Sequence, residues 1–105
     1  MDKKRFDKKL KEIRKIINKD FPITKMYLFG SMVGEKTHKY SDIDLIIVSP
    51  KFRNMNFFKR GAKMYDYWKI REPVDFLCYT PEEFRRLKNQ ITIVREVVKN
   101  GIEIF

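Results

Sequence analysis

The chain has 105 residues and a mass of 12.8 kDa, which suits one domain, and we expect residues 1–105 to form it. Lys and Arg number 24 against 14 Asp and Glu, so the formal net charge is +10. This length leaves no room for a separate substrate domain within these residues. The charge favours an anionic partner, although abundant surface lysine is an equally common cause of a basic balance.

Cysteine content and hydropathy predict a soluble cytoplasmic protein. Cys78 is the only cysteine, so no intramolecular disulfide can form. No apolar run approaches the roughly 18 residues of a membrane span, so we expect no membrane contact. The basic residues that follow Met1 lead into no apolar segment, which argues against a secretory signal.

The first half of the chain predicts a helix followed by two strands. Apolar residues spaced i, i+4, i+7 and i+11 indicate a helix that ends near Lys19. Residues 23–29 predict a short strand that stops at Gly30, and residues 42–48 a second strand. Its apolar run has no alternation, which is typical of a central strand covered on both faces. The helical apolar positions are Phe6, Leu10, Ile13 and Ile17.

The second half predicts a helix over residues 56–69, a strand over 74–79, further helix over 81–99 and a short strand over 102–105. Thr80 and Glu83 flank Pro81 as in a capping box. The last helical stretch is one helix, or two broken near Asn89. The order indicates an α/β (α+β) domain with a small mixed β-sheet and helices packed against it. The expected inward positions are Phe57, Gly61, Met64 and Trp68, then Phe84, Leu87, Ile91, Val94 and Val98.

Two aspartates begin the most apolar predicted strand. Asp42 and Asp44 are two residues apart, so on a strand both carboxylates project from one face. Two unit charges about 4 Å apart repel by roughly 4 kcal/mol at an effective dielectric constant of about 20, and a divalent ion would turn this into attraction. Oxygen ligands with no His or Cys beside them suit Mg²⁺ or Mn²⁺ better than Zn²⁺. The alternative for such a pair alone is a solvated strand end.

Asp75 and the pair Gly30-Ser31 extend this prediction. If the strand that contains Asp75 lies next to the Asp42 strand, three carboxylates converge on one edge of the sheet, enough to hold two metal ions for displacement at phosphorus. At Gly30 the backbone can approach a phosphate closely, and the Ser31 hydroxyl adds a donor. Together these residues predict a phosphate cradle beside a metal site.

The combined pattern resembles that of a known superfamily. Gly30-Ser31, ten intervening residues, Asp42-Ile43-Asp44 and Asp75 on a later strand are similar to the motif of the DNA polymerase β nucleotidyltransferases. The leading helix and the ending, Pro81-Glu-Glu-Phe followed by Val-Arg-Glu and Gly-Ile, resemble the minimal nucleotidyltransferases of bacteria and archaea. The resemblance spans nearly the whole chain.

The resemblance implies a polymerase β-like nucleotidyltransferase fold that binds Mg²⁺ and ATP. Asp42 and Asp44 would hold the metal that carries the triphosphate, and Asp75 would bind a second metal and activate the acceptor oxygen. Gly30 and Ser31 would position the phosphates. The resemblance also implies an antitoxin that transfers AMP to a protein hydroxyl, a tyrosine of a cognate HEPN-domain ribonuclease toxin.

One departure from the superfamily motif leaves a second function open. Many relatives carry Gly-Ser-x-x-Arg-Gly, whereas Gly30-Ser-Met-Val-Gly34 is one residue shorter and lacks the arginine. Lys36 or Lys39 could reach the phosphates instead. The alternative function is a catalytically weak binding module that neutralises the ribonuclease by occlusion.

Three other features have ordinary interpretations. His38, the only histidine, is expected in a surface loop. Cys78, on the strand face opposite Asp75, is expected to be a small buried hydrophobe. The basic residues of the first helix are expected to form a solvated face, with contact to RNA as the weaker interpretation.

Overall fold

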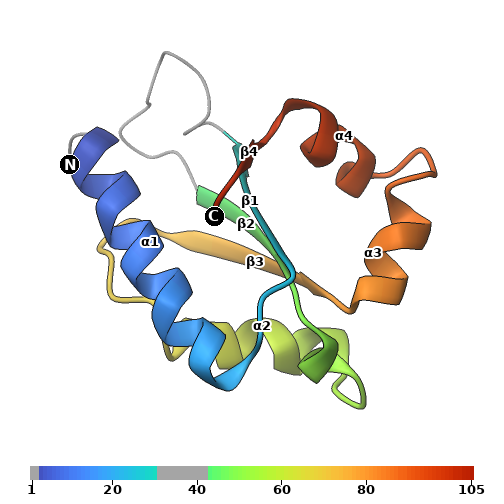
Figure 1. Cartoon of the computed structure of the whole chain (residues 1–105), viewed down its shortest axis with the longest axis horizontal. Coiled ribbons are helices and arrows are strands. Elements are labelled where there is room, and N and C mark those ends of the chain that lie inside the picture. Colours follow the sequence, from blue (N-terminus) through green and yellow to red (C-terminus); the bar gives the residue numbers. More distant parts are fainter. Residues whose placement is uncertain (1–2, 31–42) are drawn as a thin grey trace.

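The computed structural model describes residues 3–30 and 43–105. Figure 1 shows a sheet between two pairs of helices. The helices are α1 (Lys3–Asp20), α2 (Phe57–Tyr65), α3 (Pro81–Leu87) and α4 (Ile93–Asn100). The strands are β1 (Lys25–Gly30), β2 (Ile43–Val48), β3 (Val74–Tyr79) and β4 (Ile102–Glu103), and a short 3-10 turn, Pro50–Phe52, follows β2. The predicted mixed sheet with helices packed against it is therefore confirmed.

The four strands form one sheet in the order β3-β2-β1-β4. β1 is antiparallel to both of its neighbours, whereas β2 and β3 are parallel. The parallel pair needs a long connection because its second strand must start at the same edge as its first. The 3-10 turn and α2 supply that connection.

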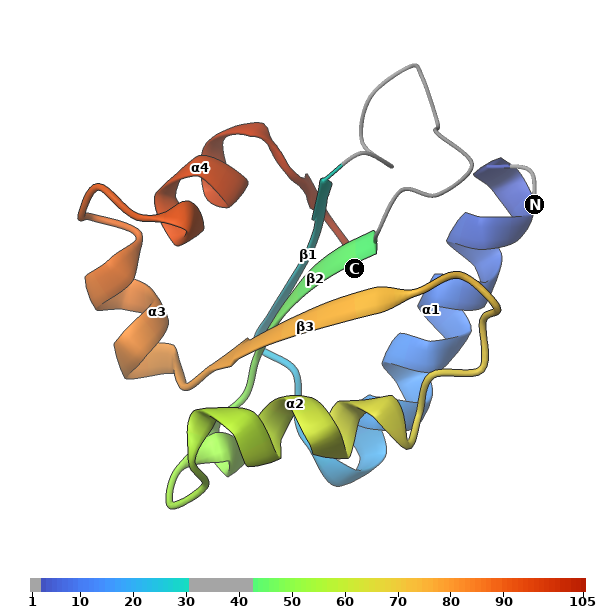
Figure 2. The ribbon, with the colours of Figure 1, turned by 180° about the vertical axis from the view of Figure 1, so that it is seen from behind.

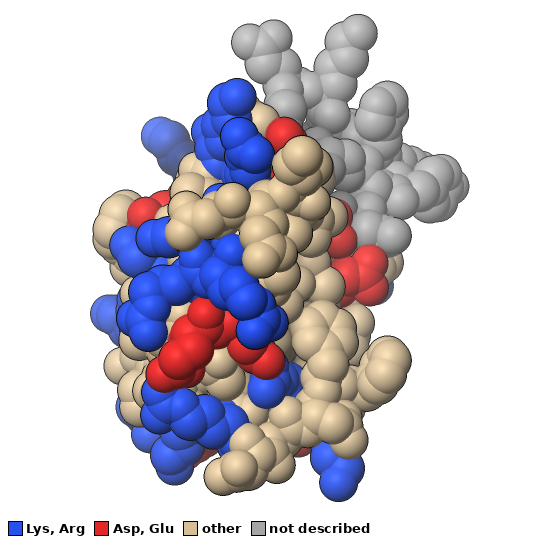
Figure 3. All heavy atoms as spheres, turned by 90° about the vertical axis from the view of Figure 1, so that its right-hand side faces the viewer, with Lys and Arg blue, Asp and Glu red and all other residues tan. Residues whose placement is uncertain are grey.

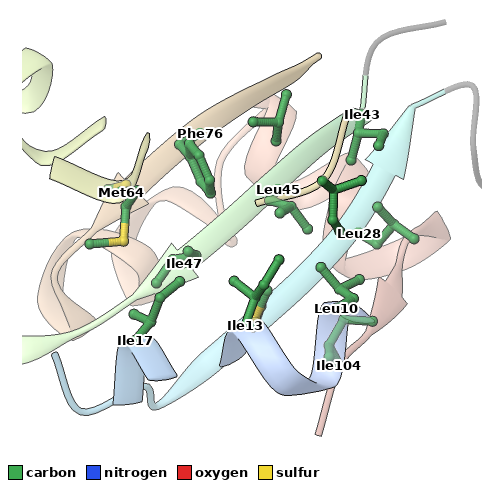
Figure 4. Close-up of a cluster of buried hydrophobic side chains, with 14 of the residues drawn as sticks. Leu10, Ile13, Ile17, Leu28, Ile43, Leu45, Ile47, Met64, Phe76 and Ile104 are labelled. Carbon is green, nitrogen blue, oxygen red and sulfur yellow. The ribbon is translucent and has the colours of Figure 1, made fainter. Parts of the chain in front are cut away.

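Two hydrophobic clusters cover the two faces of the sheet. α1 and α2 lie over one face, and α3 and α4 lie over the other, as Figures 1 and 2 show. Ile43, Leu45 and Ile47 of β2 belong to the first cluster, which Figure 4 shows in close-up. Ile46 and Val48 belong to the second. The prediction that this apolar run forms a central strand is confirmed.

Local sequence signals explain where α1 and α3 form. The four apolar residues predicted to face inward from α1 are all buried against the sheet. At the start of α3, the backbone N–H of Glu83 donates to the Thr80 hydroxyl at 3.2 Å, and the Thr80 N–H donates to the Glu83 carboxylate at 2.7 Å. The predicted capping box is therefore present. None of the helices in the described ranges could cross a membrane.

The second helix starts as predicted, with Asn56 as its N-cap, but its predicted end was wrong. α2 ends at Tyr65 rather than near Lys69, and Phe57, expected to face inward, is 41% exposed. The buried residues of α2 are Arg60 and Met64, because the Arg60 guanidinium finds acceptors inside the fold. Trp68 packs against the core as expected, but from the turn that follows the helix.

The chain between residues 81 and 99 forms two helices. Thr92 begins α4 by accepting from the Arg95 N–H at 3.2 Å, while its own hydroxyl donates to the Leu87 carbonyl at 2.6 Å. This break places Ile91 in solvent, 94% exposed, and turns Val98 outward, so both were wrongly predicted to face inward. Val94 is buried as predicted, and Val97 takes the inward place expected for Val98.

Candidate active site

Three side chains form a row across adjacent strands. Asp44 of β2 is in register with Asp75 of β3 on one side and with Phe29 of β1 on the other. Neighbouring strands are about 4.8 Å apart, so residues in register project side by side from the same face. The condition that the sequence left open, that the two aspartate strands be neighbours, is met.

The row lies on the face that carries α3 and α4. Asp44 alternates with Ile43 and Leu45, which point toward α1 and α2, and therefore projects to the opposite side. Asp44 and Asp75 are each the second residue of their strand. These two strands start beside the end of β1, as Figure 2 shows. Asp44 is half-buried and Asp75 is exposed, so the row is open to solvent at its Asp75 end.

Gly30 ends β1 next to this row. Its φ of 97° lies in the region that favours glycine, and it is in register with Ile43 at the start of β2. The other predicted site residues, Asp42, Ser31, Lys36 and Lys39, lie outside the described residues, as does His38. Within the described part of the chain, the site therefore consists of Asp44, Asp75 and the Gly30 backbone.

The donor set fits a hard divalent cation. The described residues contain no group of three or more His, Cys, Asp and Glu that could hold a metal, and Asp42, the third predicted carboxylate, falls outside them. Asp44 and Asp75 bring two carboxylates together in register, and oxygen donors of this kind are those that Mg²⁺ prefers. A cation between two close carboxylates turns their mutual repulsion into attraction.

A pocket of about 530 Å³ lies beside the row, between the end of β1 and α4. Phe29, which belongs to the row, and Gly30, which ends β1, both line this pocket. Ile93, Glu96 and Asn100 of α4 lie on its other side. Sequence reasoning missed this pocket because it depends on where α4 starts. The N-capping threonine Thr92, three residues before Arg95, was the signal that could have located that start.

Lys and Arg side chains gather on part of the side of the molecule that carries α3 and α4. Figure 3 views this side and shows them mainly over its left half, with acidic residues between them, whereas uncharged residues cover most of the right half. A positive surface near a site attracts anionic ligands such as phosphates. The exposed cations on these two helices and at the C-cap of α3 are Arg85, Arg86, Lys88, Arg95 and Lys99.

The chain is similar in sequence and in structure to known nucleotidyltransferase domains. The sequence model of the nucleotidyltransferase domain family matches residues 10–100. A crystal structure of a candidate nucleotidyltransferase from Sulfolobus solfataricus is 31% identical, with a TM-score of 0.60, over 83% of this chain and 78% of that chain. A second candidate nucleotidyltransferase of known structure is 27% identical, with a TM-score of 0.50, over 76% and 87% of the two chains. No curated protein matches the chain.

Proposed function

Because the chain belongs to the nucleotidyltransferase domain family, we propose that it transfers AMP from ATP, with Mg²⁺, to a hydroxyl group of a partner protein. The observation that carries this proposal is the register between Asp44 and Asp75 at the sheet edge where Gly30 ends β1. Paired carboxylates beside a backbone that can approach phosphate are what nucleotidyl transfer at a metal site requires.

The chemistry assigns a role to each residue. The acceptor oxygen attacks the α-phosphorus of ATP, the bond from this phosphorus to the bridging oxygen breaks, and pyrophosphate leaves. Bound Mg²⁺ would neutralise charge on the phosphate oxygens. Asp44, together with Asp42, would hold the metal that carries the triphosphate. Asp75 would help to hold a second metal, and one of its carboxylate oxygens would take the proton from the acceptor hydroxyl. The Gly30 backbone would hold phosphate, with Ser31, Lys36 and Lys39 as further phosphate-binding residues.

We propose as acceptor a tyrosine of a HEPN-domain ribonuclease, for which this chain is the cytoplasmic antitoxin. The basis is the resemblance of the chain to the minimal nucleotidyltransferases. The exposure of Asp75 supports a macromolecular acceptor, because a side chain on a protein surface can reach this end of the row.

The proposal is tested by incubating the protein with ATP labelled at the α-phosphate, Mg²⁺ and the product of the neighbouring gene. We expect label on a tyrosine of that product. Asp44→Asn and Asp75→Asn should each lower transfer at least a hundredfold. The matched control is Asp66→Asn, an exposed aspartate at the end of α2, which should transfer at the wild-type rate. Transfer by Asp75→Asn at the wild-type rate would refute the assignment.

A second candidate function is neutralisation by occlusion. It is favoured by the short sequence Gly30-Ser-Met-Val-Gly34, which lacks the arginine common among relatives. Calorimetry separates the two functions, because a pure binder gives no heat with ATP and Mg²⁺. Loss of neutralisation in Asp75→Ala, with the complex intact, would exclude occlusion alone.

A further inference from the structure

The pocket beside the aspartate row has an apolar wall and one polar rim. Phe29, Ile93 and Val97 supply the wall, and Glu96 and Asn100 supply the polar groups. Positions 93, 96, 97 and 100 lie on one face of α4, which is turned toward the end of β1. Its volume of about 530 Å³ lies within the range of small-molecule sites. Ile93 is 52% exposed, so a ligand can enter from solvent.

We propose that this pocket holds the base of the nucleoside triphosphate, an inference that rests on the function proposed above. Phe29 and Asp44 are directly opposed on antiparallel strands, so their side chains project side by side about 5 Å apart. Gly30, whose backbone would approach phosphate, also lines the pocket. A ligand with its phosphates at Asp44 therefore extends its nucleoside into the pocket, where the ring of Phe29 forms part of the apolar wall.

The polar rim selects among bases. The Asn100 amide donates to the Glu96 carboxylate at 3.1 Å, an i, i+4 contact along α4. Because a carboxylate only accepts hydrogen bonds, the amide nitrogen must face it. This leaves the Asn100 amide oxygen and the second Glu96 oxygen as acceptors, against one remaining N–H of the Asn100 amide as donor. A rim with more acceptors than donors prefers bases that carry an exocyclic amino group with two N–H donors. Adenine, guanine and cytosine have such a group, whereas uracil offers only its ring N–H.

Calorimetry with tripolyphosphate, ATP and UTP, each with Mg²⁺ and without the acceptor protein, tests this inference. Tripolyphosphate carries the charge of the nucleotide without its base. We expect ATP to bind at least tenfold more tightly than tripolyphosphate, and UTP to bind at least threefold more weakly than ATP. A tyrosine ring of the acceptor cannot account for this difference, because no acceptor is present.

Two variants locate the effect in the pocket. Ile93→Trp fills the open side of the pocket and should weaken ATP at least tenfold while leaving tripolyphosphate unchanged. Its matched control is Ile91→Trp, two residues away and 94% exposed, which should bind both ligands as the wild type does. Glu96→Gln replaces an acceptor-only group with one that also donates, and should bring ATP and UTP within twofold of each other.

The outcomes distinguish this inference from the function on which it rests. If tripolyphosphate binds as tightly as ATP, or if Ile93→Trp leaves ATP binding unchanged or stronger, the base is not in this pocket, while the proposed transfer at Asp44 and Asp75 stands. If neither ligand binds in the presence of Mg²⁺, the proposed function and the pocket assignment are both overturned.

Discussion

Asp44 and Asp75 occupy matched positions on two parallel strands, so their carboxylates share one face of the sheet without an intervening residue. Two like charges about 5 Å apart repel by about 1 kcal/mol in water. A divalent cation between them reverses this repulsion.

Mg²⁺ should therefore stabilise the fold through this pair. At a free Mg²⁺ concentration ten times its dissociation constant, binding contributes about 1.4 kcal/mol. For a domain of this size that amounts to a rise in melting temperature of several degrees. Asp75→Asn should lose this rise and melt slightly higher than the wild type in chelator. Asp66→Asn should keep the full response to Mg²⁺, and an equal response in Asp75→Asn would contradict the placement of the metal.

Nucleotide binding should depend on the metal for the same reason. The positive surface attracts a triphosphate, but the carboxylates repel it until a cation is bound. We expect the affinity for ATP to collapse in chelator. Asp44→Asn combined with Asp75→Asn should recover part of this affinity without metal, with transfer still lost. Wild-type binding that is equal with and without Mg²⁺ would mean that the basic surface alone binds the nucleotide.

The ion pair between Arg60 and Glu83 should make stability depend on pH in the acid range. Burial raises the pKa of the Glu83 carboxyl, but hydrogen bonds from Arg60, at 2.6 Å, and from the Thr80 N–H outweigh it, so the pKa lies below its ordinary value of 4.5. The stabilisation is therefore complete above pH 4.5 and is lost as the pH falls through the lowered pKa.

Glu83→Gln tests this dependence by urea denaturation between pH 2.5 and 7. At pH 7 the free energy of unfolding of the variant should be about 1 to 2 kcal/mol lower than that of the wild type. This figure is discounted for solvent screening, because the Glu83 side chain is 34% exposed. The stability of the variant should also fall less steeply in acid. Asp66→Asn breaks the exposed Lys63–Asp66 pair and should change stability by less than about 1 kcal/mol. Parallel pH profiles of wild type and Glu83→Gln would show that this pair does not titrate as described.

Two glycines should respond in opposite ways to alanine. At Gly61, inside α2, an added Cβ would meet nothing closer than the Phe76 carbonyl oxygen at 3.6 Å, so Gly61→Ala should stabilise by about 0.5 to 1 kcal/mol. At Gly101 a Cβ would lie 2.6 Å from the Val97 carbonyl oxygen and 3.1 Å from that of Leu28, so Gly101→Ala should destabilise by about 1 to 3 kcal/mol. Urea denaturation measures both, and a stabilised Gly101→Ala would contradict this packing.

The thiol of Cys78 should react only when the protein unfolds. Burial raises its pKa to about 12, although nearby Arg60 lowers it somewhat, so almost no thiolate is present near neutral pH. Alkylation at pH 7.5 should be negligible in buffer and complete in concentrated urea. As the only cysteine, it then reports unfolding without further substitution. Rapid labelling of the native protein would contradict its burial.

The sequence by itself determined those elements that are stabilised by contacts between residues close to one another in the chain. The strand over residues 74–79 and the capping box at Thr80 were predicted with their observed bounds, because proline, threonine and glutamate act within one turn. The apolar spacing of α1 was enough to identify its buried face. Asp44 and Asp75 could each be assigned to a strand, since alternation requires only neighbouring residues.

The tertiary structure decided which segments meet. Nothing between Val48 and Val74 says that the chain returns to pair beside β2, and that parallel pairing is what brings Asp75 next to Asp44. The buried Arg60 of α2 could not be predicted either, because its acceptors on β3 and α3 are distant in sequence. The pocket between Phe29 and α4 exists because Thr92 starts a new helix. Packing against β1 decides which face of this helix is buried. The spacing of apolar residues in the sequence does not show which strand the helix packs against.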